Sequence, residues 1–467
     1  MISGVYNLRS VIYILLIFAI PIFLNIKGYE YNISISILSF TYVCISIIYY
    51  SIIRFSILTW RSGIPIFYLY YFIIQPVILN NPKDNNWGLT ISDISSAIYL
   101  ATLGIISFFV GVITTRTNIE SMSYKSNIYN ILESVNNYKV IFILIIVGGV
   151  SNILTLFIGY SAENASATSE AGIVSVVSFF ITIGMLSAFS NYYLTGIKKY
   201  QKLALLSLFI VVGTGFFQNS KGAILMPILS IAFLKYSIDR KLPYLGITLI
   251  FILYIFIVYP IVSSFRYVKQ TFLSGIDNIE LIKYYINYLI SGEWFDFHIG
   301  DSSAAINDLD RGLLYYFGVI IRDSGTYIDF MGAQTYYYAL VGLIPRFIMP
   351  DKPFEAMGNI MAQRYRVISD YDFVTNVSPT YMGEFYGSFG IFGLIFGMFL
   401  CGYLANYVDT LIIKRKVNWL LPIMIFAIGW QESIIGQSIL PFLKNLITLI
   451  LFLYLLYITK FIKINFK

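Results

Sequence analysis

The chain is organised around a polar stretch that opens with SFRYVKQTFLSGIDNIELIK (264–283) and closes with PTYMGE (379–384). Between Ser264 and Glu384 there are nine basic and fourteen acidic residues, so 23 of 121 positions are charged, against 32 of the other 346. Long apolar runs flank this stretch on both sides. We therefore expect residues 264–384 to carry the functional residues and the apolar runs to form the scaffold that supports them.

The composition of the whole chain is typical of a membrane protein. Of the 467 residues, 58% are hydrophobic and only 12% are charged, and the mean hydropathy is +0.76, whereas soluble chains are about a quarter charged. The sequence therefore predicts an all-α, polytopic integral membrane protein in contact with the lipid bilayer. No basic helix or RNA-type aromatic motif accompanies the net charge of +7, so we expect no nucleic acid as a partner.

The apolar runs are long enough to cross a bilayer, which takes about 20 residues in a helix. They predict about twelve transmembrane helices, with nine in residues 1–263, one large external loop at 264–384, and three in residues 385–467. The expected spans are 9–26, 33–53, 63–80, 94–114, 139–159, 172–195, 202–218, 221–237, 243–263, 385–407, 418–436 and 440–460. The first run leads into NIKGYEYN rather than a small-x-small cleavage site, so we expect it to stay as the first span.

The distribution of basic residues predicts the orientation. If the N-terminus is cytoplasmic, eighteen of the 31 Lys and Arg residues fall in cytoplasmic segments and four in short external loops. This bias is what the positive-inside rule expects, since a long loop translocates largely regardless of its charge. Both termini are therefore predicted inside and residues 264–384 outside, which is the periplasmic side if the cell has two membranes.

Two segments of the large loop have a pattern of their own. IELIKYYINYLI (279–290) has helical periodicity. YYYALVGLIPRFIMP (336–350) is apolar for about fifteen residues before two prolines, which is too short to span and favours an interfacial or re-entrant helix. No repeat of 20–50 residues and no inverted repeat is evident.

Three arginines of the loop are candidates for binding an anion: Arg266, Arg322 and Arg346. A guanidinium grips phosphate oxygens bidentately and stays charged at any biological pH. Their alternative role is to pair with local acids such as Asp323 or to anchor lipid headgroups. Arg346 is the strongest candidate, because it lies between the apolar segment and a Pro-Asp-Lys-Pro turn.

The run PTYMGEFYGSFGIFGLIFGMFLCG (379–402) places Glu384 and Tyr386 at the external mouth of the tenth span. A carboxylate there costs desolvation, so Glu384 either pairs with a loop arginine or has a task. The five glycines from Gly383 to Gly397 are spaced along one face of a helix, which predicts close helix packing.

Polar residues near the external ends of three other spans favour a polar cavity that opens outward, although they could equally cap helices or snorkel. They are Gln75, Gln218, Asn219, Lys221, Gln431, Glu432 and Gln437. The acids around His298 fit neither an EF-hand nor an HExxH motif, and no nucleotide-binding signature is present. Cys44 and Cys401 lie in apolar runs, which favours packing over a disulfide or a thiolate metal site. We expect no metal and no cofactor.

With these residues in view, the chain resembles the Wzy-type polymerases of O-antigen and other oligosaccharide repeat units. The resemblance covers the whole plan of spans and loop, and its local features are LIPRFIMPDKP and PTYMGEFYGSFGIFG. It implies an enzyme that transfers a growing chain onto undecaprenyl-pyrophosphate-linked repeat units at the outer face of the membrane. It further implies no nucleotide, no metal and external arginines in the site, a role that falls on Arg266, Arg322 and Arg346.

The chemistry agrees with this implication. Departure of a glycosyl pyrophosphate builds negative charge that guanidinium groups can stabilise, and Glu384 could accept the proton of the acceptor hydroxyl. Further candidates for contacts with the substrate are Lys221, Tyr337, Lys352, Tyr386 and Glu432. The tyrosines at 336–338 could line a polymer groove or form an interfacial belt. A chain-length regulator is a candidate partner.

Three other functions stay open at this point. A flippase for lipid-linked oligosaccharides would predict charged residues deep in several spans and internal symmetry. An O-antigen ligase shares the general plan but uses a different acceptor. A purely structural membrane protein would tolerate replacement of the loop arginines.

Overall fold

The computed structural model describes residues 33–55, 60–79, 88–114, 137–158, 169–217, 221–239, 278–292, 312–342, 357–372, 377–415 and 439–458, with single residues between 246 and 264 and at 344 and 349. Within these ranges every regular element is a helix. The predicted all-α class is therefore confirmed for the described part of the chain.

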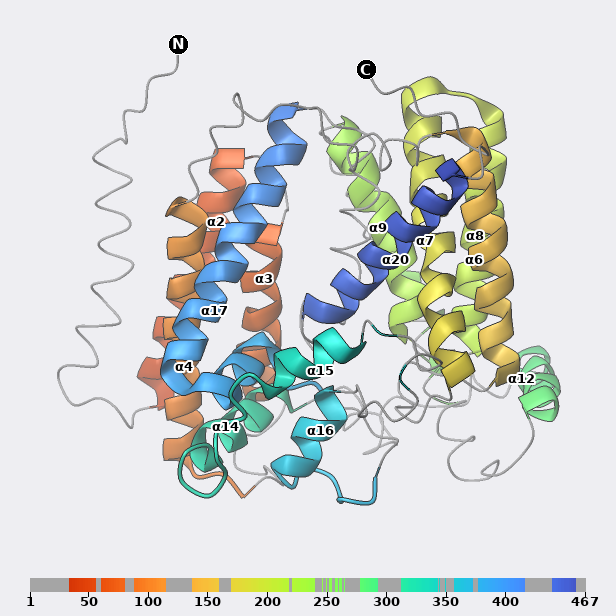
Figure 1. Cartoon of the computed structure of the whole chain (residues 1–467). Coiled ribbons are helices and arrows are strands. Elements are labelled where there is room, and N and C mark those ends of the chain that lie inside the picture. The colour runs from red at the N-terminus through yellow and green to blue at the C-terminus, as the bar shows by residue number, and fades with distance from the viewer. Residues whose placement is uncertain are drawn as a thin grey trace, which may run out of the picture.

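A first helix bundle joins the early spans to the segment that follows the large loop (Figure 1). Its long elements are α2 (Ile33–Phe55), α3 (Trp60–Leu69), which continues as the π-helix η1 (Tyr70–Leu79), α4 (Ile91–Thr114) and α17 (Thr380–Arg415). Pro76 lies inside η1 and supplies no backbone N–H, which accounts for a locally altered hydrogen-bond ladder. α4 begins with a capping box, in which Thr90 Oγ1 accepts the Asp93 N–H at 3.2 Å and Asp93 Oδ2 accepts the Thr90 N–H at 2.8 Å.

A second bundle stands beside the first and has its own apolar core (Figure 1). It consists of α6 (Tyr138–Ile158), α7 (Ser169–Thr195), α8 (Lys198–Phe217), α9 (Lys221–Asp239) and α20 (Ile439–Ile458). The core contains phenylalanines such as Phe180, whose ring lies 4.8 Å from that of Phe452 on α20. The last described helix thus returns to pack on the middle of the chain.

The part of the large loop that the structure describes contains four short helices: α12 (Asn278–Ser291), α14 (Leu313–Asp323), α15 (Gln334–Gly342) and α16 (Met357–Arg364). The helix predicted over 279–290 is confirmed by α12. Residues 312–342 and 357–372, here called the cap, gather at one end of the first bundle (Figure 1). α15 contacts α17 of the first bundle and α20 of the second, so the cap links the two.

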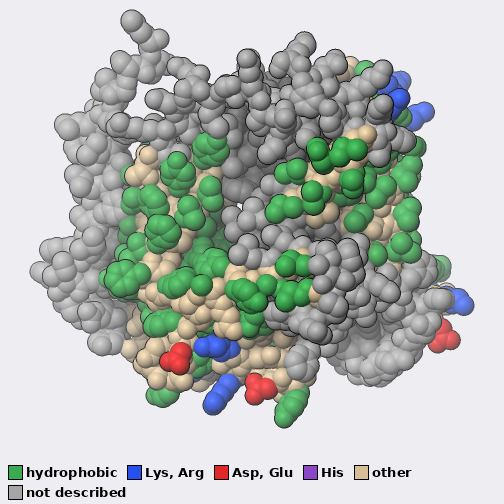
Figure 2. Space-filling model, in the orientation of Figure 1, with side chains coloured by type: hydrophobic (Ala, Val, Ile, Leu, Met, Phe, Trp, Pro, Cys, Tyr) green, Lys and Arg blue, Asp and Glu red, His purple; other side chains and the backbone are tan. Residues whose placement is uncertain are grey.

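Exposed hydrophobic side chains lie on helices of both bundles. Figure 2 shows hydrophobic side chains over the flanks of the helices, while the described charges lie toward the ends. Among the described helices, five are long and apolar enough to cross a membrane: α4, α6, the later part of α7, α8 and α17 up to Tyr407. This supports a membrane protein, and the number of twelve crossings stays a prediction. The expected spans 9–26 and 418–436 lie outside the described residues.

The end of the second bundle opposite the cap is rich in lysine and tyrosine. The Lys199 amine lies 4.5 Å from the centre of the Tyr138 ring, and the Lys235 amine lies 5.9 Å from that of Tyr193. These contacts bring together the start of α6, the end of α7, the start of α8 and the end of α9. All four were predicted on one side of the membrane, and the cap lies at the other end of the helices (Figures 1 and 2).

Two glycines let α4 and α17 approach backbone to backbone. A Cβ at Gly402 of α17 would clash with the Phe108 carbonyl oxygen, and one at Gly111 of α4 would clash with the Phe399 carbonyl oxygen. Near the same end, Arg61 of α3 is fully buried and its Nη1 donates to Asn406 Oδ1 of α17 at 2.8 Å. These contacts fix the depth of α17 relative to α3 and α4.

The close approach predicts a strong effect of one methyl group. Gly402→Ala should force α4 and α17 apart and lower the free energy of unfolding by about 1–3 kcal/mol, the range for overpacking a core. Gly149→Ala on α6 is the matched control, because the nearest atom to its Cβ would be an ordinary 3.5 Å away. Thermal unfolding of both variants in detergent, followed by fluorescence-detected size exclusion, checks this. Equal melting temperatures would contradict the packing described here.

Candidate functional site

The first part of α17 is a separate short helix. Phe389 (φ −137°, ψ 19°) and Gly390 (φ 64°, ψ −149°) leave helical geometry, so residues 380–388, here called the half-helix, precede a long helix over 391–415. The predicted single seam of five glycines is wrong, because the break at Gly390 divides the series. The half-helix bends sharply away from the rest of α17 (Figure 1).

The glycines on the two sides of the break serve different contacts. A Cβ at Gly397 would overlap the Phe385 ring, so the long helix lies close against the half-helix. A Cβ at Gly383 would lie 2.9 Å from Ile320 of α14, and one at Gly387 would lie 2.9 Å from the Met361 methyl of α16. The half-helix is therefore wedged between the cap and the long helix that follows it.

The C-terminal end of the half-helix is tied to the segment between α14 and α15. The N–H of Met331 donates to Gly387 O and the N–H of Gly332 donates to Ser388 O, both at 2.9 Å. The Ser388 and Thr335 hydroxyls lie 3.2 Å apart. This end of the half-helix thus lies at the level of the cap.

The N-terminal end of the half-helix lies deep in the first bundle. The Met382 N–H donates to the Tyr68 hydroxyl at 3.3 Å, and Tyr68 lies near the middle of the continuous α3 and η1 pair. The Met382 methyl would lie 3.3 Å from a Cβ at Gly104, which is in the middle of α4. The half-helix therefore runs from the interior of the bundle back toward the cap.

Glu384 lies on this half-helix and is 1% exposed. It was expected at the external mouth of a span, and the structure instead places it inside the bundle. Among the described residues its Oε1 has no hydrogen-bond partner, and no ion pair to it is found there. Burying an ionised carboxylate without partners costs desolvation free energy. This group therefore either stays neutral or is stabilised by a hydrogen-bonding partner that binds there.

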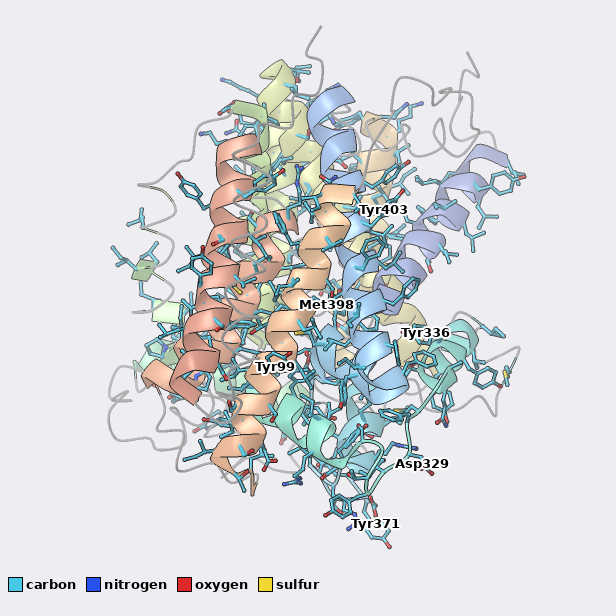
Figure 3. All side chains as sticks on the ribbon, turned by 90° about the vertical axis from the view of Figure 1, so that its left-hand side faces the viewer. Tyr99, Asp329, Tyr336, Tyr371, Met398 and Tyr403 are labelled. Atoms are coloured by element: carbon cyan, nitrogen blue, oxygen red, sulfur yellow. The ribbon has the colours of Figure 1, made fainter. Side chains whose placement is uncertain are left out.

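Two polar side chains lie near Glu384. Tyr336 of α15 stacks on Phe389 with ring centres 6.1 Å apart, and Figure 3 shows it beside the cap end of α17. Burial, together with the charge of Glu384, raises the pKa of Tyr336 to about 12, so the phenol stays a hydrogen-bond donor. Cys401 on the long helix is close enough for electrostatic interaction with Glu384.

Arg322 is engaged in contacts within the protein. Its Nε donates to Asp323 Oδ1 at 2.7 Å, its Nη2 donates to Asp323 Oδ2 at 3.0 Å, and its Nη1 donates to Gly88 O at 3.2 Å. The first two bonds form a bidentate pair, which is the geometry that the same group would use on a phosphate. These contacts favour the alternative in which Arg322 pairs with a local acid, and they fasten α14 to the start of α4.

Of the other candidate residues, Tyr337 is 54% exposed on α15. Tyr386 is half-buried, with its ring 6.4 Å from Phe317 and 6.3 Å from Phe330. Lys221 begins α9. Arg266, Arg346, Lys352 and Glu432 lie outside the described residues, as do the acids around His298. In the described chain Glu384 and Tyr386 share the half-helix, two residues apart and on different faces.

Sequence reasoning missed two residues that shape this site. Thr380 starts the half-helix with φ 62°, an unusual value for a β-branched residue. Tyr68 contacts the same point from a helix more than 300 residues earlier. The Ser-Pro-Thr sequence before an apolar run is a signal for a helix start at Thr380, whereas nothing local to Tyr68 marks its contact.

The described residues include no group of three or more His, Cys, Asp and Glu side chains that could hold a metal ion. The arrangement can offer a buried carboxylate, Glu384, and a phenol, Tyr336, to a molecule that enters from the cap end. No family model, curated protein or solved structure matches the chain.

Proposed function

We propose that the protein is a membrane glycosyltransferase that polymerises lipid-linked oligosaccharide repeat units. The donor and the acceptor are undecaprenyl-pyrophosphate-linked oligosaccharides, and the product is O-antigen or a related surface polysaccharide. The observation that carries the proposal is Glu384, a buried carboxylate on a half-helix that ends at the cap. The resemblance of PTYMGEFYGSFGIFG to the polymerase family supports the substrate class.

In the proposed reaction the acceptor hydroxyl attacks the anomeric carbon of the donor sugar. A new glycosidic C–O bond forms while the C–O bond to the pyrophosphate breaks, and the carboxylate of Glu384 takes the hydroxyl proton. The electron pair of the broken bond leaves with the lipid pyrophosphate, whose charge is stabilised by guanidinium groups. Because Arg322 is paired with Asp323, we assign this task to Arg266 and Arg346 first. No nucleotide and no metal takes part.

The location follows from the expected orientation. The protein lies in a bacterial inner membrane with both termini in the cytoplasm and the cap in the periplasm, where a chain-length regulator could bind. The lysine-rich end of the second bundle, opposite the cap, supports this orientation.

Reporter fusions test the orientation. Alkaline phosphatase fused after residue 330 should be active, because this position lies in the cap, and the same enzyme fused after residue 199, at the start of α8, should be inactive. The reverse pattern would put the cap in the cytoplasm and remove the proposed site.

Arg346→Lys should reduce polymer formation almost as much as Arg346→Ala. Lysine keeps the charge but lacks the two parallel donors of a guanidinium, and losing a bidentate contact costs about 2–4 kcal/mol of transition-state stabilisation. Arg366→Lys is the control, since Arg366 is exposed at the outer side of the cap. Polymer length is compared at matched membrane expression. Wild-type polymer from Arg346→Ala would remove this residue from the site.

One structural observation favours a second candidate, a flippase for lipid-linked oligosaccharides. Broken helices whose N-termini lie inside the helix bundle are typical of transporters, and the half-helix starts beside Tyr68 in the interior of the first bundle.

Deleting the gene and analysing the surface polysaccharide by length separates these functions. Loss of polymer, with single repeat units still attached to the cell surface, would support the polymerase. Loss of single units as well would support a flippase or an O-antigen ligase, and an unchanged length profile would contradict all three.

A further inference from the structure

The N–H groups at the start of a helix have no partners within the helix and must be satisfied by other groups, above all where no water is present. The half-helix starts inside the bundle, so its first N–H groups face this requirement. The Met382 N–H donates to the Tyr68 hydroxyl at 3.3 Å, and the Tyr381 N–H lies near the same oxygen. The Gly383 N–H donates to Thr380 Oγ1 at 3.3 Å.

The two capping oxygens also lie near each other, because the Tyr68 hydroxyl is close to the side chain of Thr380. Both residues are buried, with 3% of Tyr68 and 1% of Thr380 exposed. The Tyr68 ring is itself held by Phe72, with ring centres 5.1 Å apart at a nearly perpendicular angle. The cap of the half-helix is therefore supplied partly by another helix and is anchored in the core.

Thr380 has a backbone conformation that threonine rarely adopts. Its φ of 62° is costly for a β-branched residue and persists only where surrounding contacts impose it. Here the hydrogen bond from the Gly383 N–H to Thr380 Oγ1 and the packing against Tyr68 hold this conformation. Glu384 follows Thr380 by four residues and so lies on the same face of the half-helix, one turn further on.

We infer that Tyr68 and Thr380 are positioning residues, which fix the start of the half-helix and thereby the place and direction of the Glu384 carboxylate. The inference rests on the proposed role of Glu384 in the reaction, but the geometry it describes can be measured without activity. Neither residue touches the reacting atoms. Their effect is to keep a buried base within reach of an acceptor hydroxyl, since a misplacement of about 1 Å can cost a factor of 10² in rate.

The first test uses four variants that differ in one property each. Tyr68→Phe removes only the hydroxyl. Thr380→Val removes the capping oxygen and keeps the branched shape, whereas Thr380→Asn keeps an oxygen at the cap and tolerates a positive φ. Thr102→Val is the matched control, because Thr102 is a buried threonine of α4 whose hydroxyl donates to Ile98 O of its own helix at 2.8 Å.

Tyr68→Phe and Thr380→Val should lower kcat for polymer formation by about 10- to 100-fold with little change in KM. Thr380→Asn should recover most of the loss, and Thr102→Val should behave like the wild type. The assay uses purified protein in detergent with the lipid-linked repeat unit. Equal activity of Thr380→Val and Thr102→Val would overturn the inference, as would a loss in Thr380→Asn as large as that in Thr380→Val.

The second test reads the position of residue 384 directly. Glu384→Cys is made in a protein whose two cysteines are replaced by alanine, and its reaction with a membrane-impermeant methanethiosulfonate is timed. Because residue 384 is buried, labelling should be slow and should become at least fivefold faster when Tyr68→Phe or Thr380→Val is added, but not with Thr102→Val. Ser369→Cys on the cap surface should label at one rate in all backgrounds.

If Tyr68→Phe and Thr380→Val leave the labelling rate at residue 384 unchanged, the positioning role is overturned, regardless of the function of the protein. Altered labelling together with an unchanged polysaccharide profile after gene deletion would instead leave the positioning role standing and remove the proposed function. The two failures are therefore distinguishable.

Discussion

Glu384→Gln is expected to abolish polymer formation while the protein folds normally. An amide cannot accept the proton of the acceptor hydroxyl, and general base catalysis contributes about 10²–10⁴-fold to a rate. The side chain keeps its shape, so the packing around the half-helix is preserved. Turnover of the lipid-linked repeat unit in detergent checks the first part, and thermal unfolding checks the second.

The stability of this variant carries its own information. The Glu384 carboxyl is buried, and its Oε1 has no partner in the described structure, so a neutral amide of similar shape costs no more desolvation than the carboxyl does. The melting temperature should therefore stay the same or rise. A large fall would indicate that Glu384 holds the fold together through a partner outside the described residues, and would count against a catalytic task.

Two further substitutions sharpen the result. Glu384→Asp keeps the carboxyl but moves it back by one methylene. If the position of the carboxyl matters, this variant should keep only part of the activity. If only its charge mattered, the activity would be unchanged. Glu280→Gln is the control, because Glu280 is an exposed acid of the same large loop, on α12. Equal losses in Glu384→Gln and Glu280→Gln would mean that acidity of the loop, rather than this carboxyl, matters.

The positions of most described helices could be predicted from hydropathy alone. Apolar runs of about 20 residues predicted α4, α6 and α8 within a few residues, because burial in lipid or core requires that backbone groups be satisfied within each helix. α12 could likewise be predicted from the periodicity of its own residues. Arg322 illustrates a partial success, since its adjacent partner Asp323 was one of two predicted alternatives.

The shape of the site depends on contacts that no local pattern reveals. FYGSFGIFG suggests an uninterrupted glycine-containing helix, whereas the chain breaks at Phe389 and Gly390. The break is imposed from outside the segment, by the hydrogen bonds of Met331 and Gly332 to the end of the half-helix. Arg61 and Asn406 are likewise 345 residues apart in sequence. Such pairings exist only once the bundle has assembled, so composition and spacing could not predict them.

Gly390→Ala is expected to be the most damaging single-methyl change in α17 for activity. The φ of 64° and ψ of −149° at Gly390 fall in a region that is almost restricted to glycine, and a side chain there costs about 1–3 kcal/mol. The added Cβ would also lie only 3.2 Å from the Phe330 ring. Alanine has no side-chain torsion that could move its Cβ away, so the residue itself cannot relieve either effect.

The chain can escape the strain by moving the half-helix toward a straight continuation of α17. That movement would break the bonds of Gly387 and Ser388 to the cap and withdraw Glu384 from its place. Gly390→Ala should therefore lose polymer formation as completely as Glu384→Gln, and, unlike it, should also lower the melting temperature. The control is Gly213→Ala on α8, whose Cβ would meet no atom within 4 Å.

Accessibility separates a displaced half-helix from a protein that is merely less stable. In Gly390→Ala, a cysteine placed at residue 384 should react faster with a membrane-impermeant reagent, while Ser369→Cys on the cap should react at its usual rate. Full activity of Gly390→Ala, or a loss matched by Gly213→Ala, would mean that the bend does not set the geometry of the site. A uniform rise in reactivity at both positions would point to general loosening of the fold. Because the break at Phe389 and Gly390 sets the direction of the half-helix that carries Glu384, a rise confined to residue 384 is the result expected.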